Sequence, residues 1–144
     1  MDTKPLSDSD RELIDRVIKT NERSFDDSFF EGAHIVAAGV RTTDRTVYDG
    51  VSLPAAIGRA SLCAEPVAIG SAVADGHNHD DIETCVAISY PMDGHDAEDH
   101  RVVPPCGVCR EMLVDYNDEM RVIVTEDGEP RVTRAVELLP GRTW

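Results

Sequence analysis

Two cysteine motifs constrain the fold of this chain more than any other feature. The first reads CAEP over residues 63–66, and the second reads PPCGVC over residues 104–109. Cys106 and Cys109 are three residues apart at the start of a predicted helix, so their sulfurs lie on the same side of it. A helix N-terminus offers free N–H groups and positive potential, which favour thiolate over thiol. We therefore expect a fold that brings two helix N-termini together.

Cys63 opens the other predicted helix, residues 63–74, which is small and apolar with Pro66 in its first turn, where proline is tolerated. Three thiolates at two helix starts form a soft tetrahedral site with one open position, which is typical of catalytic zinc. A structural zinc site completed by Cys85 or by a histidine is the alternative. Cys85 stands in an apolar run, which favours a buried small hydrophobe.

Glu65 is the candidate proton carrier at this site. If Cys63 and Glu65 were both helical, they would diverge by about 200° around the helix axis. Glu65 can face the metal only if Cys63 is the N-cap and has non-helical backbone. Zinc with an open position activates water near neutral pH, and a nearby carboxylate can then transfer protons.

The rest of the chain alternates between helical and strand patterns. An amphipathic helix is predicted over residues 9–22, with Ser9 and Glu12 as a capping box. A hairpin over 34–52, loops over 53–62 and 91–103, a helix over 106–116 and strands over 84–90, 121–125 and 131–138 complete the prediction. This order predicts a three-layer α/β/α fold with a mixed five-stranded sheet, in one domain spanning residues 1–144.

The charge of the chain restricts its partners. It has 28 acidic and 14 basic residues, a net charge of −14, and no basic run. Such a surface repels nucleic acids and anionic membranes. The start of the chain, MDTKPLSDSD, lacks the basic flank and apolar core of a signal peptide, and no apolar run approaches the ~20 residues that span a bilayer. We therefore expect a cytoplasmic protein, in which cysteines at motif spacing are more often metal ligands than disulfides.

Together the motifs resemble those of the cytidine deaminase family, in which a glutamate follows the first zinc ligand by two residues and a later P-C-x-x-C supplies the others. CAE and PCGVC match this pattern, and the order of elements follows the family over nearly all 144 residues. The resemblance implies one Zn²⁺ per subunit on Cys63, Cys106 and Cys109, with Glu65 as the proton shuttle. It also implies a homotetramer that deaminates cytidine or deoxycytidine to the uracil product and ammonia, in pyrimidine salvage.

The substrate-binding part of the resemblance is altered. Family members that act on cytidine carry an Asn-x-Glu-Asn element before the first cysteine, where this chain has SLPA over residues 52–55. Proline cannot hydrogen-bond a ribose hydroxyl through its side chain and lacks an N–H. One alternative is therefore a deaminase of blasticidin S, whose deaminase also departs from this element, or of another aminated heterocycle. A second is a non-catalytic, zinc-stabilised binding protein.

Five residues are predicted to contact the substrate: Ser52, Arg59, Ala64, Phe30 and Trp144. Three of them have a structural alternative, because Arg59 could be solvated, Phe30 could pack in the core and Trp144 could cover a subunit seam.

Arg110 is predicted to balance the thiolate charge, because Pro66 stands where the family often has arginine. The loop histidines His77 and His79, with Asp80 and Asp81, could bind a cation, although a solvated loop is the simpler interpretation. The same holds for His95 and His100.

Overall fold

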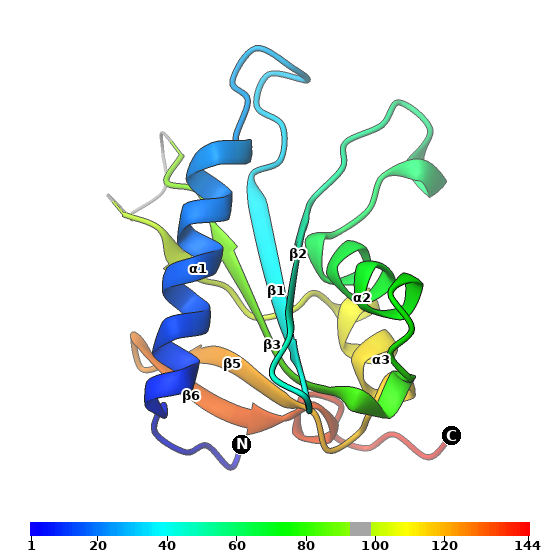
Figure 1. Cartoon of the computed structure of the whole chain (residues 1–144). Helices are drawn as coiled ribbons and strands as arrows, with labels where there is room; N and C mark the ends of the chain where they lie inside the picture. Colours follow the sequence, from blue (N-terminus) through cyan, green and yellow to red (C-terminus); the bar gives the residue numbers. More distant parts are fainter. Residues whose placement is uncertain (93–98) are drawn as a thin grey trace.

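The computed structural model describes residues 1–92 and 99–144, so His95 lies outside the described residues. Three α-helices and six strands follow one another along the chain (Figure 1). They are α1 (Asp8–Ser24), β1 (Val36–Thr42), β2 (Val47–Val51), α2 (Ala64–Ala74), β3 (Ile82–Ser89), β4 (Arg101–Val102), α3 (Gly107–Tyr116), β5 (Arg121–Glu126) and β6 (Glu129–Arg134). None of the described helices is both long and apolar enough to cross a membrane.

The strands form one mixed sheet in the order β2-β1-β3-β5-β6. β3 and β5 are parallel, and the other neighbours in this order are antiparallel. The short β4 pairs with the far end of β3, opposite Ile88 and Ser89. The five-stranded prediction is therefore one strand short, because β4 lies within the segment predicted as a loop.

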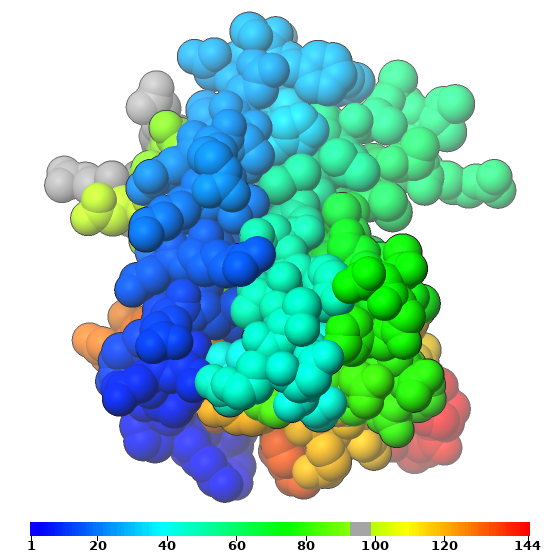
Figure 2. All heavy atoms as spheres, in the orientation of Figure 1, coloured from blue at the N-terminus to red at the C-terminus, as the bar shows by residue number. Residues whose placement is uncertain are grey.

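Helices cover both faces of the sheet, which confirms the three-layer prediction. On one face, Leu13 and Val17 of α1 pack against buried side chains such as Val86 and Ile123. On the other face, α2 and α3 enclose a second buried cluster that includes Ile69 and Leu113. Figure 2 shows α1, the β1–β2 hairpin and α2 packed side by side on one side of the molecule.

The start of α1 differs from the prediction. Ser7, not Ser9, is the N-cap: its hydroxyl accepts from the Asp10 amide, while the Asp10 carboxylate accepts from the Ser7 amide. The physical reason is that Asp10 is fully buried and bonded to the guanidinium groups of Arg41 and Arg121, which fixes the first turn of the helix.

The predicted boundary of the last strand, residue 138, is also wrong. β6 stops at Arg134, and residues Ala135–Leu138 form a 3₁₀ turn in which Ala135 and Leu138 are buried three residues apart. That spacing belongs to a helical turn and not to a strand, whose buried side chains alternate.

The loop between β2 and α2 leaves the body of the protein and returns to the same place. Leu53 and Leu62 exchange two backbone hydrogen bonds of 2.9 and 3.0 Å. Residues 54–61 between them stand out from the sheet (Figures 1 and 2). Both ends of this loop are therefore fixed at the point where α2 begins.

Candidate metal centre and active site

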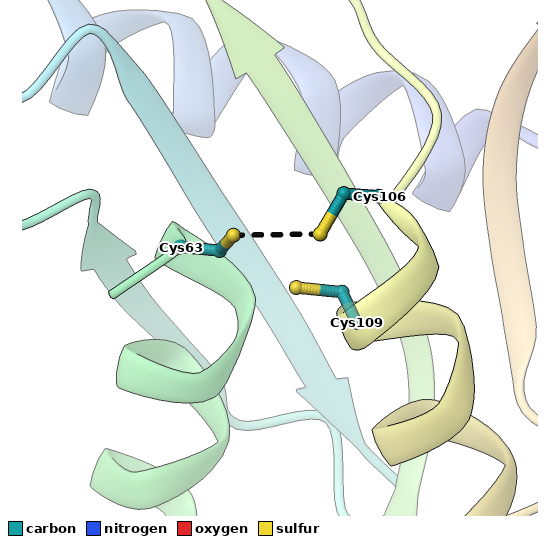
Figure 3. Close-up of side chains that lie close together, drawn as sticks. All are labelled: Cys63, Cys106 and Cys109. Carbon is teal, nitrogen blue, oxygen red and sulfur yellow. Dashed lines mark hydrogen bonds between the residues drawn. The ribbon is translucent and has the colours of Figure 1, made fainter. Parts of the chain in front are cut away.

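The N-terminal ends of α2 and α3 lie next to each other, and each carries one of the two cysteine motifs. Cys63 is the N-cap of α2 and Cys106 is the N-cap of α3. Their backbones are extended, with φ/ψ of −68°/164° and −68°/171°. The geometry that Glu65 requires, a capping Cys63 outside the helix, is thus present. Figure 3 shows the sulfurs of Cys63, Cys106 and Cys109 pointing toward one another from the two helices.

The three sulfurs fit one Zn²⁺. All lie within 4.8 Å of one another, and the Sγ atoms of Cys63 and Cys106 are 3.5 Å apart. Cys109 is buried, while Cys63 and Cys106 are exposed. In the part of the chain that the structure describes, no histidine, carboxylate or fourth cysteine joins this cluster. The donor set is the soft one that zinc prefers, and it leaves a coordination position open.

Glu65 lies in the first turn of α2 and is 5% exposed. Its Oε2 accepts a hydrogen bond from the Cys109 thiol across 3.5 Å, so the carboxylate adjoins the sulfur cluster. Burial raises the pKa of Glu65 above its ordinary value, because the charged form is poorly solvated there. A carboxyl with a raised pKa is suited to accept and return protons near neutral pH.

The thiols differ in how readily they ionise. Burial, and then the nearby Glu65, raise the pKa of Cys109. Burial also raises the pKa of Cys63, with a further contribution from Cys106. For Cys106, burial acts upward, but hydrogen bonds from the Cys109 and Val108 amides and from the Cys63 thiol lower the pKa overall. A helix N-terminus thus supports one thiolate directly, and bound zinc deprotonates coordinating thiols outright.

A cavity of about 280 Å³ opens beside the cluster. Glu65 and two of the cysteines line it together with apolar residues and two serines. Its lining residues are Val36, Ser52, Ser61, Leu62, Cys63, Ala64, Glu65, Val103, Pro104 and Cys106. The size is near the lower end of small-molecule sites, which suits a single ring with a modest substituent.

The structure places two of the five predicted substrate residues, Ser52 and Ala64, in this lining. Arg59 lies in the exposed 3₁₀ turn Gly58–Ala60, outside the lining. Phe30 is 50% exposed and packs edge-to-face on Phe29. Trp144 is 76% exposed, with the Arg142 guanidinium 5.5 Å from its ring centre. In a single chain, these three do not reach the cavity.

Sequence reasoning missed the cavity walls. Val103 and Pro104 immediately precede the second cysteine motif, and Ser61 and Leu62 immediately precede the first. The signal that could have found them is proximity: residues leading into two converging helix starts must border the same space. Val36, at the start of β1, is far from both cysteine motifs in the sequence, so nothing in the sequence indicated that it borders the cavity.

Arg110 and two of the histidines, His34 and His79, bond to backbone carbonyl oxygens. The Arg110 Nε donates to the Pro105 carbonyl at 2.8 Å, so the guanidinium supports the loop that carries Cys106. His34 and His79 bond through Nδ1 to the Ser52 and Tyr116 carbonyl oxygens, both at 2.7 Å.

His100 bonds through Nδ1 to Asn21 Oδ1 at 2.8 Å. Among the described residues, none of the histidines joins a metal-binding group.

The sequence matches a known family over most of its length. Residues 7–126 fit the model of the cytidine and deoxycytidylate deaminase zinc-binding region. The chain belongs to this family. It is also 35% identical to blasticidin-S deaminase of Bacillus cereus over 140 residues, which are 97% of this chain and 96% of that protein. Family membership makes the chain a hydrolase that acts on C–N bonds, with a zinc-binding site that its three cysteines fit.

Solved structures share the fold. The crystal structure of cytidine deaminase from Burkholderia pseudomallei has a TM-score of 0.69 at 24% identity, covering 96% of this chain and all of that one. That of the Bacillus anthracis cytidine deaminase has a TM-score of 0.71 at 23% identity, covering 92% and 87%. These likenesses establish a cytidine deaminase-like α/β fold and leave the substrate to be argued from the site.

Proposed function

We propose that the chain catalyses the hydrolytic deamination of a cytosine ring carried by a nucleoside or nucleoside analogue. The observation that supports this most is the position of Glu65, a buried carboxylate beside an open three-cysteine cluster, facing a cavity of about 280 Å³. Water adds to the ring carbon that bears the amine, the C–N bond breaks, and the products are the oxo ring and ammonia.

Zinc, when bound, supplies the Lewis acidity that makes water a nucleophile near neutral pH. Cys63, Cys106 and Cys109 would hold it, and the two helix N-termini would offset part of the thiolate charge. Glu65 takes one proton from water and delivers it to the ring nitrogen. It then takes the remaining proton of the added hydroxyl and delivers it to the amine, which leaves as ammonia. Burial raises the pKa of Glu65 above the ordinary value, which favours the uptake of a proton.

The cavity walls explain how a planar ring would be held. Val36, Val103 and Pro104 are apolar side chains on the wall, and Ser52 and Ser61 offer hydroxyl groups. Ser52 is itself fixed, because its hydroxyl accepts from the Val36 amide at 3.1 Å and its carbonyl bonds to His34. We propose that Ser52 and Ala64 contact the ring or its substituent.

Cytidine and deoxycytidine are the first substrates to test, and blasticidin S is the second candidate. Two observations favour the second. Glu65 is the one carboxylate among the described lining residues, which include no side-chain amide, so ribose hydroxyls lack an acidic or amide partner in a single chain. The 35% identity to a blasticidin-S deaminase covers 97% of the chain.

A substrate panel tests the proposal directly. The zinc-loaded protein is incubated with cytidine, deoxycytidine, cytosine and blasticidin S, and ammonia release is measured for each. Glu65→Gln, which keeps the shape and removes the proton carrier, is the matched control. Turnover of cytidine supports the first candidate, turnover of blasticidin S alone supports the second, and release from none of the four overturns the proposal.

The remaining features of the proposal come from the family resemblance. We propose a homotetramer, in which Arg59, Phe30 and Trp144 could approach a neighbour's cavity although they do not reach their own. We also propose a cytoplasmic role in pyrimidine salvage. Light scattering on the zinc-loaded protein measures the subunit number, and a monomer would exclude the contribution of neighbours.

A further inference from the structure

The helix that follows Cys63 and carries Glu65 packs closely against the sheet at Gly50. Gly50 is the buried residue of β2, the edge strand beside α2 (Figure 1). A Cβ at this position would lie 2.4 Å from the Ala68 nitrogen and 2.7 Å from the Ala64 carbonyl oxygen. Both are backbone atoms of α2. Since real contacts are not this short, any side chain at residue 50 must push the helix and the strand apart.

The displacement would reach the metal ligands within one turn. Ala64 is the residue between Cys63 and Glu65, and it is 1% exposed. Ala68 is fully buried one turn later. Because the clashing atoms are backbone, no side-chain rotation can relieve the contact, and α2 must move as a unit.

The other two sulfurs are carried by a different helix, since Cys106 is the N-cap of α3 and Cys109 lies in its first turn. The nearest atoms to a Cβ at residue 50 all belong to α2, so the displacement acts on α2 and not directly on α3. A shift of α2 therefore changes the separation between Cys63 and the other two sulfurs. Restoring the contact at Gly50 from 2.4 Å to the 3.4 Å of ordinary packing takes about 1 Å of movement. Metal sites tolerate only about 0.2 Å in their bond lengths.

We propose that Gly50 is a positioning residue of the metal centre, because the absence of a side chain there sets the distance of Cys63 and Glu65 from Cys106 and Cys109. The inference rests on the zinc centre and not on the identity of the substrate. Its test is therefore metal binding, which reports whether or not any substrate is turned over. Changes around metal ligands lower affinity by about 10- to 100-fold, and we expect Gly50→Ala to fall in this range.

Two other glycines provide matched controls. Gly39 lies in β1, and a Cβ there would meet Val17 Cγ2 at 2.4 Å and Leu13 Cδ1 at 3.2 Å, which are side-chain atoms of α1. Gly39→Ala therefore disturbs the opposite face of the sheet. Gly70 lies within α2 itself and has nothing within 4 Å of such a Cβ, so Gly70→Ala changes the same helix without a clash.

The experiment measures three quantities for each variant: the zinc dissociation constant against a chromophoric chelator, the thermal midpoint of the metal-free protein, and the thiolate charge-transfer band with cobalt. We expect Gly50→Ala to bind zinc about 10- to 100-fold more weakly and to alter the cobalt band. Gly39→Ala should lower the thermal midpoint and retain zinc affinity, and Gly70→Ala should retain both.

Two results would overturn the inference. One is wild-type zinc affinity in Gly50→Ala, and the other is an equal loss of affinity in Gly39→Ala at a similar loss of thermal stability. If Gly50→Ala does not fold, Ala68→Ser adds a single atom to the fully buried residue whose backbone lies against Gly50. Unchanged zinc affinity in folded Ala68→Ser would then count against the inference.

Discussion

Two buried carboxylates lie on helices that cover opposite faces of the sheet, and they have opposite acid–base properties. Asp10 is fully buried and receives two hydrogen bonds of 2.7 Å from the Arg121 guanidinium, with Arg41 Nη2 at 3.4 Å. Burial alone would raise the pKa of Asp10, but the hydrogen bonds from Arg121 and Ser7 outweigh it and lower the pKa to about 2. Glu65 is nearly as buried, and its pKa is raised by that burial.

The difference between the two lies in their partners. The one side-chain hydrogen bond of Glu65 among the described residues comes from a thiol, which brings no positive charge. A guanidinium hydrogen-bonded to a buried carboxylate holds it as an anion, whereas a carboxylate without a bonded cationic side chain can exchange protons more readily. The first arrangement suits structure and the second suits catalysis. The following predictions test this contrast, from the largest expected effect to the smallest.

Replacing Glu65 with glutamine should abolish turnover and spare the metal. Loss of general acid–base help lowers rates by about 10²- to 10⁴-fold, while the three cysteines remain in place. Ammonia release and the zinc-to-protein ratio are measured on the same preparation. Loss of zinc together with activity would instead make Glu65 a part of the metal-binding group.

Replacing Asp10 with asparagine should cost stability and leave the metal centre intact. The change leaves the buried Arg41 and the partly buried Arg121 without their shared carboxylate, and breaking a buried ion pair typically costs about 3–5 kcal/mol. Urea unfolding of the metal-free protein measures this cost. Asp8→Asn, which removes a fully exposed partner of Arg11, is the control and should change little. An equal loss of stability in Asp10→Asn and Asp8→Asn would show that the buried ion pairs of Asp10 do not have the structural role assigned to them.

The stability of the wild-type protein should fall in acid because of Asp10. Its folded-state pKa of about 2 lies below its ordinary value of 3.8, so the folded state binds fewer protons. The resulting stabilisation is present above pH 3.8 and is lost as the pH falls toward 2. The shift corresponds to about 2 kcal/mol. Unfolding free energies measured across this range should show this loss in the wild type and its absence in Asp10→Asn.

Glu65 should change the pH dependence of stability less than Asp10 does, and in the opposite direction. Because its folded-state pKa is raised, the folded protein binds more protons than the unfolded chain above the ordinary value of 4.5, and stability falls as the pH rises through the folded pKa. Glu65→Gln removes this loss. The metal-free variant should therefore be slightly more stable than metal-free wild type at neutral pH and equal to it at pH 4. A variant that is less stable at neutral pH would contradict the role of burial.

Local sequence predicted the metal centre well because its requirements are local. Cys63 and Cys106 each stand at the start of a helix, where capping, charge and the position of Pro66 agree. Glu65 can face the metal only if Cys63 lies just before the helix. This requirement involves two residues close together in the sequence, so it can be recognised from the sequence alone. The exact cap of α1 was not accessible in the same way, because Asp10 is held by Arg121, which is 111 residues away.

Elements without a distinctive local pattern were predicted less well. Val136 and Leu138 read as a continued strand, yet the burial of Ala135 and Leu138 closes a 3₁₀ turn. The two residues of β4 are too few to show an alternation, and they become a strand only by pairing with β3. The cavity wall at Val36 depends on how β1 lies beside the two helix starts, which is a tertiary property.

The backbone bridge between Leu53 and Leu62 has a consequence for how this scaffold can change. Because the chain leaves and re-enters the body at one point, residues 54–61 can lengthen, shorten or be replaced without moving the start of α2. The segment ends at Ser61, which borders the cavity together with the adjoining Leu62. This border of the cavity and the metal ligands therefore belong to separate parts of the chain, so a loop grafted between the two leucines is a route by which evolution or an engineer could reshape the cavity beside an unchanged metal centre.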